Sequence, residues 1–314
     1  MAQEGRVLYE KLINNMNKVI VGKEETMTLL GIALIAGGHI LLEDVPGTGK
    51  TKMAKALAKS LQVDFSRIQF TPDLLPSDIT GLNVYDPKSG EFLLRKGPVF
   101  TNVLLADEIN RATPRTQAGL LEVMEERQIT IDGETYIPGD LFFVIATQNP
   151  VETAGTFPLP EAQLDRFMMR LSMGFPAYEE EVKILDTYLE EDPLDSLRGV
   201  ITLSELLQVR ELANKIYVAP CIRDYIVRIV RATREDKQVL MGASTRGALA
   251  LLRGAKAMAC LRGSEYCIPD DVKLIAEPVL AHRILLGYGQ TTDNKEFIRK
   301  TIDRIPVPTE DFTK

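Results

Sequence analysis

The chain has 314 residues, of which 45% are hydrophobic and 26% are charged, and its formal net charge is −7. This length and apolar content allow a large core in one large or two modest domains. The acidic balance leaves no basic footprint for nucleic acid, no apolar run is long enough to span a membrane, and residues 1–6 lack a signal-peptide pattern. We therefore expect a soluble, cytoplasmic protein.

The first two predicted elements are a helix and a strand. Residues 8–20 have the spacing of an amphipathic helix and lead into Val21-Gly22-Lys23, and an apolar strand follows at 39–43. A glycine after a helix is explained equally well as an ordinary helix end or as part of a ligand contact.

The run from Asp44 to Thr51, Asp-Val-Pro-Gly-Thr-Gly-Lys-Thr, is typical of a phosphate-binding loop. A strand precedes it and helical spacing follows at 53–61, so the backbone N–H groups and the helix dipole face one anion. We expect Lys50 to face the β- and γ-phosphates of a nucleotide and Thr51 to bind Mg²⁺. Asp44 departs from the strict pattern, which has a glycine there. An ordinary turn before a helix is the weaker alternative.

Two further strands end in polar residues. The apolar strand at 102–106 leads into Asp107 and Glu108, which fit a Mg²⁺ ligand and a base that orients water, although a solvated acidic turn is the alternative. The strand at 141–147 leads to Asn149, which is placed to hold a γ-phosphate oxygen or the attacking water. With strands at 65–70 and 168–172 and helices between them, the pattern predicts a three-layer α/β core with its ligand at the carboxyl ends of parallel strands.

Two insertions interrupt this core, and helices follow it. Residues 85–97 contain turn chemistry, and residues 128–137 alternate around Asp132-Gly133 as a hairpin does. Helical spacing predominates after residue 176, at 178–191, 203–216, 224–234, 244–261 and 269–283. Ser244 is a good N-cap for the helix that carries Arg246 in its first turn. A cation there opposes the helix dipole, which contact with a bound phosphate would offset.

The cysteines and histidines do not predict a metal or redox site. Cys221, Cys260 and Cys267 lack paired spacing, and His39 and His282 are isolated from each other in the sequence.

Three long strings identify a family. They run from Leu105 to Ala112 (Leu-Ala-Asp-Glu-Ile-Asn-Arg-Ala), from Ala146 to Pro150 (Ala-Thr-Gln-Asn-Pro), and from Gly155 to Phe167 (Gly-Thr-Phe-Pro-Leu-Pro-Glu-Ala-Gln-Leu-Asp-Arg-Phe). With these strings the chain resembles an AAA+ ATPase, and specifically the MoxR family, from about residue 19 to about residue 283. The position of Asp44 is often acidic in that family.

The resemblance implies a role for each motif residue. Lys50 and Thr51 correspond to Walker A, Asp107 and Glu108 to Walker B, and Asn149 to sensor 1. Arg246 corresponds to sensor 2 and Arg166 to the arginine finger, with Arg170 and Arg111 as the other finger candidates. The expected nucleotide contacts are Val21, Gly22, Pro46, Gly47, Thr48, Gly49, Lys50, Thr51 and Arg246.

The resemblance also implies the organisation and the activity. We expect an AAA+ P-loop core at 1–175 and an all-α lid at 176–314, with 85–97 and 128–137 resembling inserts that line the centre of a ring; a surface hairpin without a partner is the alternative. The implied function is Mg²⁺-dependent ATP hydrolysis in a ring, with ATP/ADP bound and six subunits expected, that remodels a partner with a von Willebrand A-type domain. A helicase-like or DNA-associated motor and a weakly hydrolysing regulatory subunit are the alternatives.

Overall fold

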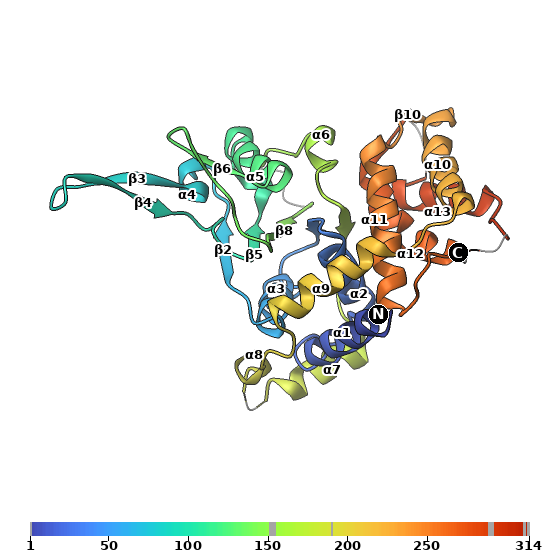
Figure 1. Cartoon of the computed structure of the whole chain (residues 1–314), viewed down its shortest axis with the longest axis horizontal. Coiled ribbons are helices and arrows are strands. Elements are labelled where there is room, and N and C mark those ends of the chain that lie inside the picture. Colours follow the sequence, from blue (N-terminus) through green and yellow to red (C-terminus); the bar gives the residue numbers. More distant parts are fainter. Residues whose placement is uncertain (1, 151–154, 190, 288–291, 310–311, 313–314) are drawn as a thin grey trace.

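The five predicted core strands form one parallel sheet with the order β2-β5-β8-β1-β9. Their bounds are Ile40–Glu43 (β1), Phe65–Gln69 (β2), Val103–Asp107 (β5), Phe143–Gln148 (β8) and Met169–Leu171 (β9). Figure 1 labels β2, β5 and β8 of this sheet. The structure is a computed structural model that describes residues 2–150, 155–189, 191–287, 292–309 and 312. The expected α/β class is confirmed.

Alternation along the strands builds a separate hydrophobic layer on each face of the sheet. On β5, Val103 and Leu105 belong to one buried cluster, and Leu104 and Ala106 belong to the other. Helices cover both faces, as a parallel sheet requires. The helices of this part are Ala2–Met16 (α1), Glu24–Ala36 (α2), Lys50–Ser60 (α3), Pro76–Thr80 (α4), Pro114–Glu126 (α5) and Glu161–Leu164 (α6). A short 3₁₀ turn, η1 (Ile109–Arg111), precedes α5.

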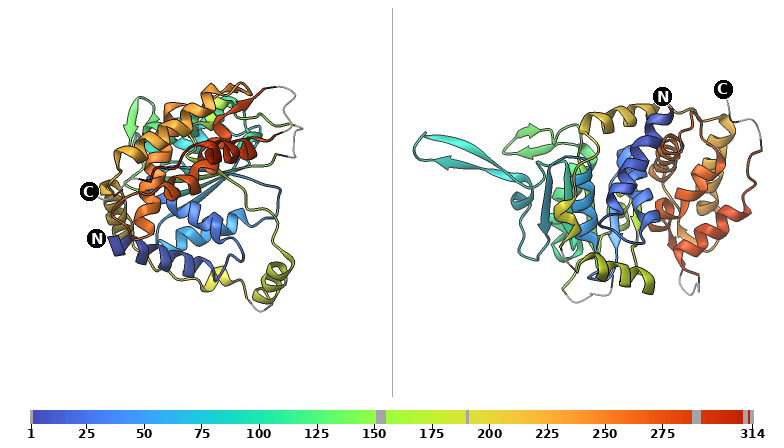
Figure 2. Two further views of the ribbon diagram at one scale, coloured as in Figure 1. Left: turned by 90° about the vertical axis from the view of Figure 1, so that its right-hand side faces the viewer. Right: turned by 90° about the horizontal axis from the view of Figure 1, so that it is seen from below.

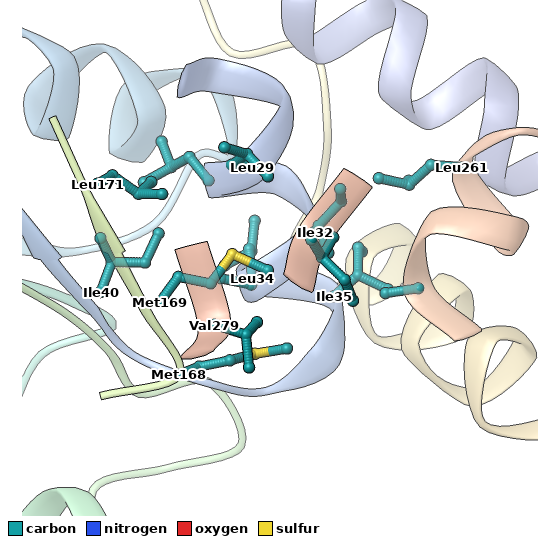
Figure 3. Packing of buried hydrophobic residues seen from close by; sticks show 14 of the residues in the cluster. Leu29, Ile32, Leu34, Ile35, Ile40, Met168, Met169, Leu171, Leu261 and Val279 are labelled. Carbon is teal, nitrogen blue, oxygen red and sulfur yellow. The ribbon is translucent and has the colours of Figure 1, made fainter. Parts of the chain in front are cut away.

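The first cluster continues from the sheet into the C-terminal helices. Figure 3 shows Leu29 and Ile32 of α2 between Ile40 of the sheet and Leu261, which comes from the C-terminal part. The C-terminal elements are Tyr178–Thr187 (α7), Pro193–Ser196 (α8), Leu203–Lys215 (α9), Pro220–Glu235 (α10), Thr245–Leu261 (α11), Pro269–Leu280 (α12), Ala281–Arg283 (η2) and Asn294–Arg304 (α13). One shared core therefore fixes the lid helices on α2.

The lid is helical as expected, with one addition. A two-stranded antiparallel ribbon joins β10 (Val239–Met241) to β11 (Leu285–Leu286). The chain between α7 and α9 first returns to the core, where Lys59 Nζ donates to the Leu194 carbonyl at 2.8 Å. The boundary at 175/176 stays a prediction.

Both insertions are hairpins, and the first begins earlier than predicted. It pairs β3 (Gly81–Asp86) with β4 (Glu91–Lys96), so it starts four residues before the expected 85–97 segment. The second pairs β6 (Ile129–Ile131) with β7 (Glu134–Tyr136). Figure 2 shows the β3–β4 hairpin projecting from the body on the side away from the lid.

Candidate functional site

The loop between β1 and α3 leaves the start of a helix open to an anion. Gly47 and Gly49 have φ of 86° and 89°, in the left-handed region that glycine adopts without strain. Gly49 is the N-cap of α3, and none of the described side chains caps the helix by a hydrogen bond. Lys50 Nζ instead donates to the carbonyls of Asp44 at 2.8 Å and Val45 at 3.2 Å. Burial lowers the pKa of Lys50, although nearby carboxylates oppose that shift.

Asp44, the departure from the strict loop pattern, connects the loop to the end of β9. Its buried carboxylate accepts a hydrogen bond from the Ser172 hydroxyl at 2.8 Å and from the Gly174 N–H at 3.1 Å, and the Met173 N–H is a third donor. These three donors explain why an acid, and not a glycine, occupies this position.

The two acids at the end of β5 point in different directions. Asp107 Oδ1 accepts a 2.6 Å hydrogen bond from the Thr147 hydroxyl, which in turn accepts one from the Glu108 N–H at 2.9 Å. Glu108 has a φ of 56°, an unusual left-handed conformation for a residue with a side chain. The two carboxylates therefore have different hydrogen-bond partners, and their division into a metal ligand and a base stays a prediction.

Three residues that the sequence analysis did not assign to this carboxylate network contact these acids. Arg67 donates to Asp107 Oδ2 at 2.7 Å, and Gln69 donates to Glu108 Oε2, also at 2.7 Å. Arg111, one of the finger candidates, donates to the same Glu108 oxygen at 3.1 Å. Arg67 and Gln69 lie two residues apart on β2, which pairs with β5, so strand alternation places both on the same face as Asp107. Their spacing places both side chains on one face of β2, but only the pairing of β2 with β5 shows that this face is that of Asp107.

One cavity of about 650 Å³ collects most of the predicted nucleotide residues. Its polar wall includes Pro46, Gly47, Thr48, Gly49, Lys50, Thr51, Asp107, Glu108 and Asn149. Its apolar wall includes Val19, Ile20, Val21, Met173, Pro176, Ile184, Leu185 and Tyr188. A site of this volume with a polar and an apolar wall suits a phosphate-bearing ligand with a flat ring.

Gly22 serves the cavity indirectly. It is not among the lining residues, but its φ is 69°, and a Cβ there would come within 2.0 Å of the Glu180 carboxyl group. The positive φ therefore favours a glycine in this turn, which lies beside the Glu180 side chain of α7. Of the two predicted base contacts, only Val21 lines the cavity.

Arg166 and Arg246 meet each other at a different place. Arg166 Nε lies 2.7 Å from Glu125 Oε2, and Arg246 donates to Oε1 of the same carboxylate. Glu125 thus supplies the negative charge that offsets the helix dipole at Arg246, where the sequence suggested a phosphate. Arg170, another finger candidate, pairs with Glu43 at 3.3 Å.

The arginine pair lies at the opposite edge of the sheet from the cavity. The pocket that Arg166 and Arg246 line also contains Gly38, which precedes β1, and Met168, which precedes β9. It therefore lies at the amino ends of strands whose carboxyl ends face the cavity. Neither arginine is among the described residues that line the cavity. The four residues of β1 alone span about 13 Å.

The lid holds both arginines in place. Asp165 forms an ion pair with the buried Arg283, whose Nε lies 2.7 Å from Asp165 Oδ1. Asp165 Oδ2 also accepts a hydrogen bond from the Ser244 hydroxyl at 2.9 Å. Ser244 also accepts from the Arg246 N–H at 3.1 Å, so the predicted N-cap is present. The segment that carries Arg166 and the helix that carries Arg246 are therefore joined through Asp165 and Ser244.

Two of the three cysteines are buried thiols. Burial raises the pKa of Cys260 to about 11 and of Cys267 to about 12, which makes both thiols unreactive. Among the described residues, no cluster of three or more His, Cys, Asp or Glu forms a metal site, and no helix has the length and apolar character to cross a bilayer.

Comparison with known proteins agrees with this geometry. Residues 39–169 match the model of the ATPase family associated with various cellular activities (AAA), and residues 231–305 match the AAA lid domain. A crystal structure of a protein from Cytophaga hutchinsonii, described provisionally as an ATPase, is 38% identical and covers 98% of both chains with a TM-score of 0.89. The fold and the site thus define an ATPase of the AAA class.

Two curated relatives narrow the class to a family. The uncharacterised protein YeaC of Bacillus subtilis is 46% identical, with 96% of this chain and 95% of the relative covered. Chaperone MoxR1 of Mycobacterium tuberculosis is 41% identical, with 90% of this chain and 77% of the relative covered. The chain belongs to the MoxR family of AAA+ ATPases.

Proposed function

We propose that this protein hydrolyses Mg-ATP in a ring, and that Arg166 and Arg246 of one subunit act on the nucleotide of the next. The observation that carries the proposal is the placement of the arginine pair and the cavity at opposite edges of one sheet. A surface that must meet a different surface on a second copy makes a head-to-tail contact, and repeated contacts of that kind form a ring when the rotation between subunits closes, or an open filament when it does not. Six subunits is the size that the family resemblance favours.

The residues of the cavity fit a nucleotide and Mg²⁺. The uncapped start of α3 offers N–H donors to phosphate oxygens, and the Lys50 ammonium donates to two carbonyl oxygens of the loop, which a phosphate would replace. Thr51 and Asp107 would hold Mg²⁺, a cation that takes few protein ligands and keeps several waters. The bound ion would neutralise charge that develops on the phosphate oxygens.

The remaining side chains of the site would carry the chemistry. Glu108 would orient and polarise the attacking water, and Asn149 would position that water or a phosphate oxygen by a hydrogen bond. Gln69 and Arg111 now donate to Glu108, and Arg67 donates to Asp107, so these donors would share the two carboxylates with the water and the Mg²⁺. Arg166 and Arg246 would leave Glu125 for the neighbouring phosphate, where a guanidinium stabilises transition-state charge.

The proposal is tested by measuring ATP hydrolysis and sedimentation with and without nucleotide. The wild-type chain should hydrolyse ATP and sediment as a ring, and Lys50→Ala should lose nucleotide affinity without losing its fold. Lys55→Ala is the matched control, because Lys55 is exposed on the same helix and does not line the cavity. A wild-type chain that binds ATP without hydrolysing it would favour the regulatory alternative instead.

The energy of hydrolysis is proposed to remodel a partner protein. A chaperone-like role and a partner with a von Willebrand A-type domain are what the family resemblance favours, and the net charge of −7 weighs against a DNA motor. Affinity capture with the Glu108→Gln variant and ATP should retain the partner on a ring that does not turn over. Recovery of nucleic acid without protein would overturn this part of the proposal.

A further inference from the structure

Helix α7 carries a row of apolar side chains that this chain leaves uncovered. None of its ten residues, all within the described part of the chain, is buried. Tyr178, Val182 and Leu185 follow the i, i+4, i+7 spacing of one helix face. Phe175 lies just before the helix, and Leu189 lies in the turn just after it. Tyr178 is 75% exposed, Leu185 is 69% exposed and Leu189 is 78% exposed. We call these five residues the α7 face.

The other side of α7 forms a wall of the nucleotide cavity. Ile184 and Tyr188 line the cavity, and the ammonium of Lys52 lies 3.7 Å from the centre of the Tyr188 ring. The start of the helix is held by the turn after α1, where Lys23 Nζ donates to the Phe175 carbonyl at 3.1 Å. A ten-residue helix is only marginally stable unless tertiary packing supports it. A partner on the α7 face would supply that support.

Exposed apolar side chains also lie close to Arg246 in the sequence. Leu240 and Met241 of β10 and Leu249 of α11 are 63%, 40% and 51% exposed, and they flank Arg246 in the sequence. We call these three residues, with Arg127, Arg246 and Arg253, the arginine face. All three of its arginines are exposed and line or adjoin the pocket that holds Glu125.

The charges of the two faces are opposite. Helix α7 carries Glu179, Glu180, Glu181 and Asp186 against one lysine, Lys183. Apolar rows bordered by opposite charges favour a specific contact and set its orientation. Within one chain the faces cannot meet, because the cavity and the arginine pocket lie at opposite edges of the sheet.

We infer that the α7 face of one subunit docks on the arginine face of the next subunit. This inference rests on the proposed function and deepens it, because the contact that buries the α7 face also carries Arg246 toward the neighbouring cavity. Leu185 belongs to the α7 face and lines the cavity, so nucleotide binding and subunit docking act on one helix. Assembly should therefore depend on nucleotide.

The first test removes the apolar contact without touching the cavity. In the triple variant Tyr178→Ser, Val182→Ser, Leu189→Ser, none of the changed residues lines the cavity. We expect its assembly with ATP to weaken by about a hundredfold or more, since each buried apolar side chain contributes more than a tenfold factor. Binding of a fluorescent ADP analogue by the monomer should change by less than about threefold. The matched control is Val227→Ser, Leu274→Ser, Val307→Ser, which removes three exposed apolar side chains that lie outside both faces and should assemble normally.

The second test identifies the partner surface by cross-linking. Cys221 is half-buried and could react with the cross-linker, so it is first replaced by serine. Cys260 and Cys267 are buried and are left in place. Chains with Val182→Cys are then mixed with chains with Leu249→Cys and treated with a short bis-maleimide. A cross-link that forms in the mixture with ATP, and in neither chain alone, is the expected result.

Each other outcome overturns a specific statement. A cross-link of Val182→Cys chains with themselves would make the α7 face a two-fold contact and overturn this inference. A triple variant that assembles and hydrolyses ATP like wild type would overturn it while leaving the ring intact. A wild-type chain that stays monomeric with ATP at all concentrations tested would overturn both the ring and the inference.

Discussion

Arg166 reaches Glu125 across 2.7 Å, and the second oxygen of that carboxylate is occupied by Arg246. Two guanidinium groups repel each other, so one carboxylate between them is what allows them to lie together. Because all three side chains are partly exposed, each ion pair contributes only about 0–1 kcal/mol to stability. Such weak contacts are suited to being exchanged for a phosphate.

The first prediction concerns where Arg166 acts. Arg166→Ala should bind ATP normally and hydrolyse it poorly, and a mixture with Lys50→Ala subunits should recover part of the activity. At some interfaces of the mixed ring an intact Lys50 then meets an intact Arg166 of the adjacent chain, which neither parent ring offers. Steady-state hydrolysis of each parent and of the mixture is the measurement.

The control for this mixture is Arg170→Ala, because Arg170 pairs with Glu43 of its own chain. If ATP hydrolysis recovers in the mixture with Arg170→Ala and not in the mixture with Arg166→Ala, Arg170 is the arginine finger. No recovery with either, despite demonstrated subunit exchange, would contradict action between subunits with independently firing sites.

The second prediction concerns Glu125. Glu125→Gln keeps the shape of the side chain and removes the charge that holds both arginines, so we expect the maximal rate to fall by about threefold to tenfold with the affinity for ATP unchanged. Glu122→Gln, an exposed change on the same helix, should leave the rate alone. A Glu125→Gln variant that loses affinity in step with rate would assign Glu125 to folding rather than to positioning.

The third prediction separates nucleotide binding from chemistry. Glu108→Gln retains a hydrogen-bonding group for Gln69 and removes the carboxylate that polarises water, so ATP should bind while turnover falls by about a hundredfold or more. Nucleotide affinity and turnover are measured on the same preparation. Turnover close to wild type would place the base elsewhere, with Asp107 as the first residue to examine.

The fourth prediction concerns stability and Asp44. Asp44→Ala leaves the N–H groups of the buried Met173 and the half-buried Gly174, and the hydroxyl of the exposed Ser172, without their acceptor, and should lower the free energy of unfolding by about 2–4 kcal/mol. Asp44→Asn keeps one oxygen acceptor and should cost less. Urea denaturation without nucleotide gives both values, and the exposed change Asp140→Ala should stay within about 0.5 kcal/mol of wild type. Equal stability of Asp44→Ala and wild type would contradict the statement that Asp44 stabilises the fold by connecting the loop to the end of β9.

Sequence patterns predicted the sheet and one wall of the site because both depend on neighbours in the chain. Apolar runs mark β5 and β8, and the loop before α3 is identified by its own glycines, Gly47 and Gly49. Arg67 and Gln69 required knowledge that β2 pairs with β5, which no local pattern supplies.

The arginine pair was predicted residue by residue but not as a pair. Glu125, Arg166 and Arg246 come from α5, from the turn after α6 and from α11, and they meet only because the lid packs at the amino edge of the sheet. Such long-range packing follows from the whole core, in which α2 contacts both sheet and lid (Figure 3). For the same reason the β10–β11 ribbon was not expected.

The fifth prediction is a loss of stability in mild acid that originates at His39. Burial lowers the pKa of His39 to about 4, whereas the unfolded chain titrates near 6.5. Between these values the unfolded state binds a proton that the folded state excludes, so the free energy of unfolding falls as pH falls from 6.5, by up to about 1.4 kcal/mol per pH unit. The pKa of His282 is also lowered by burial, so it adds to the same slope.

The measurement is urea denaturation at intervals from pH 7.5 to pH 5, a range above most carboxylate titrations. In the folded chain the Val144 N–H donates to His39 Nδ1 at 3.0 Å, and Nε2 lies 3.2 Å from the Met124 carbonyl oxygen. His39→Asn offers one acceptor and one donor in a smaller side chain, so it should lower stability at pH 7.5 and flatten the slope below pH 6.5. A slope as steep as that of wild type would show that His39 does not titrate between the folded and unfolded states as its burial requires.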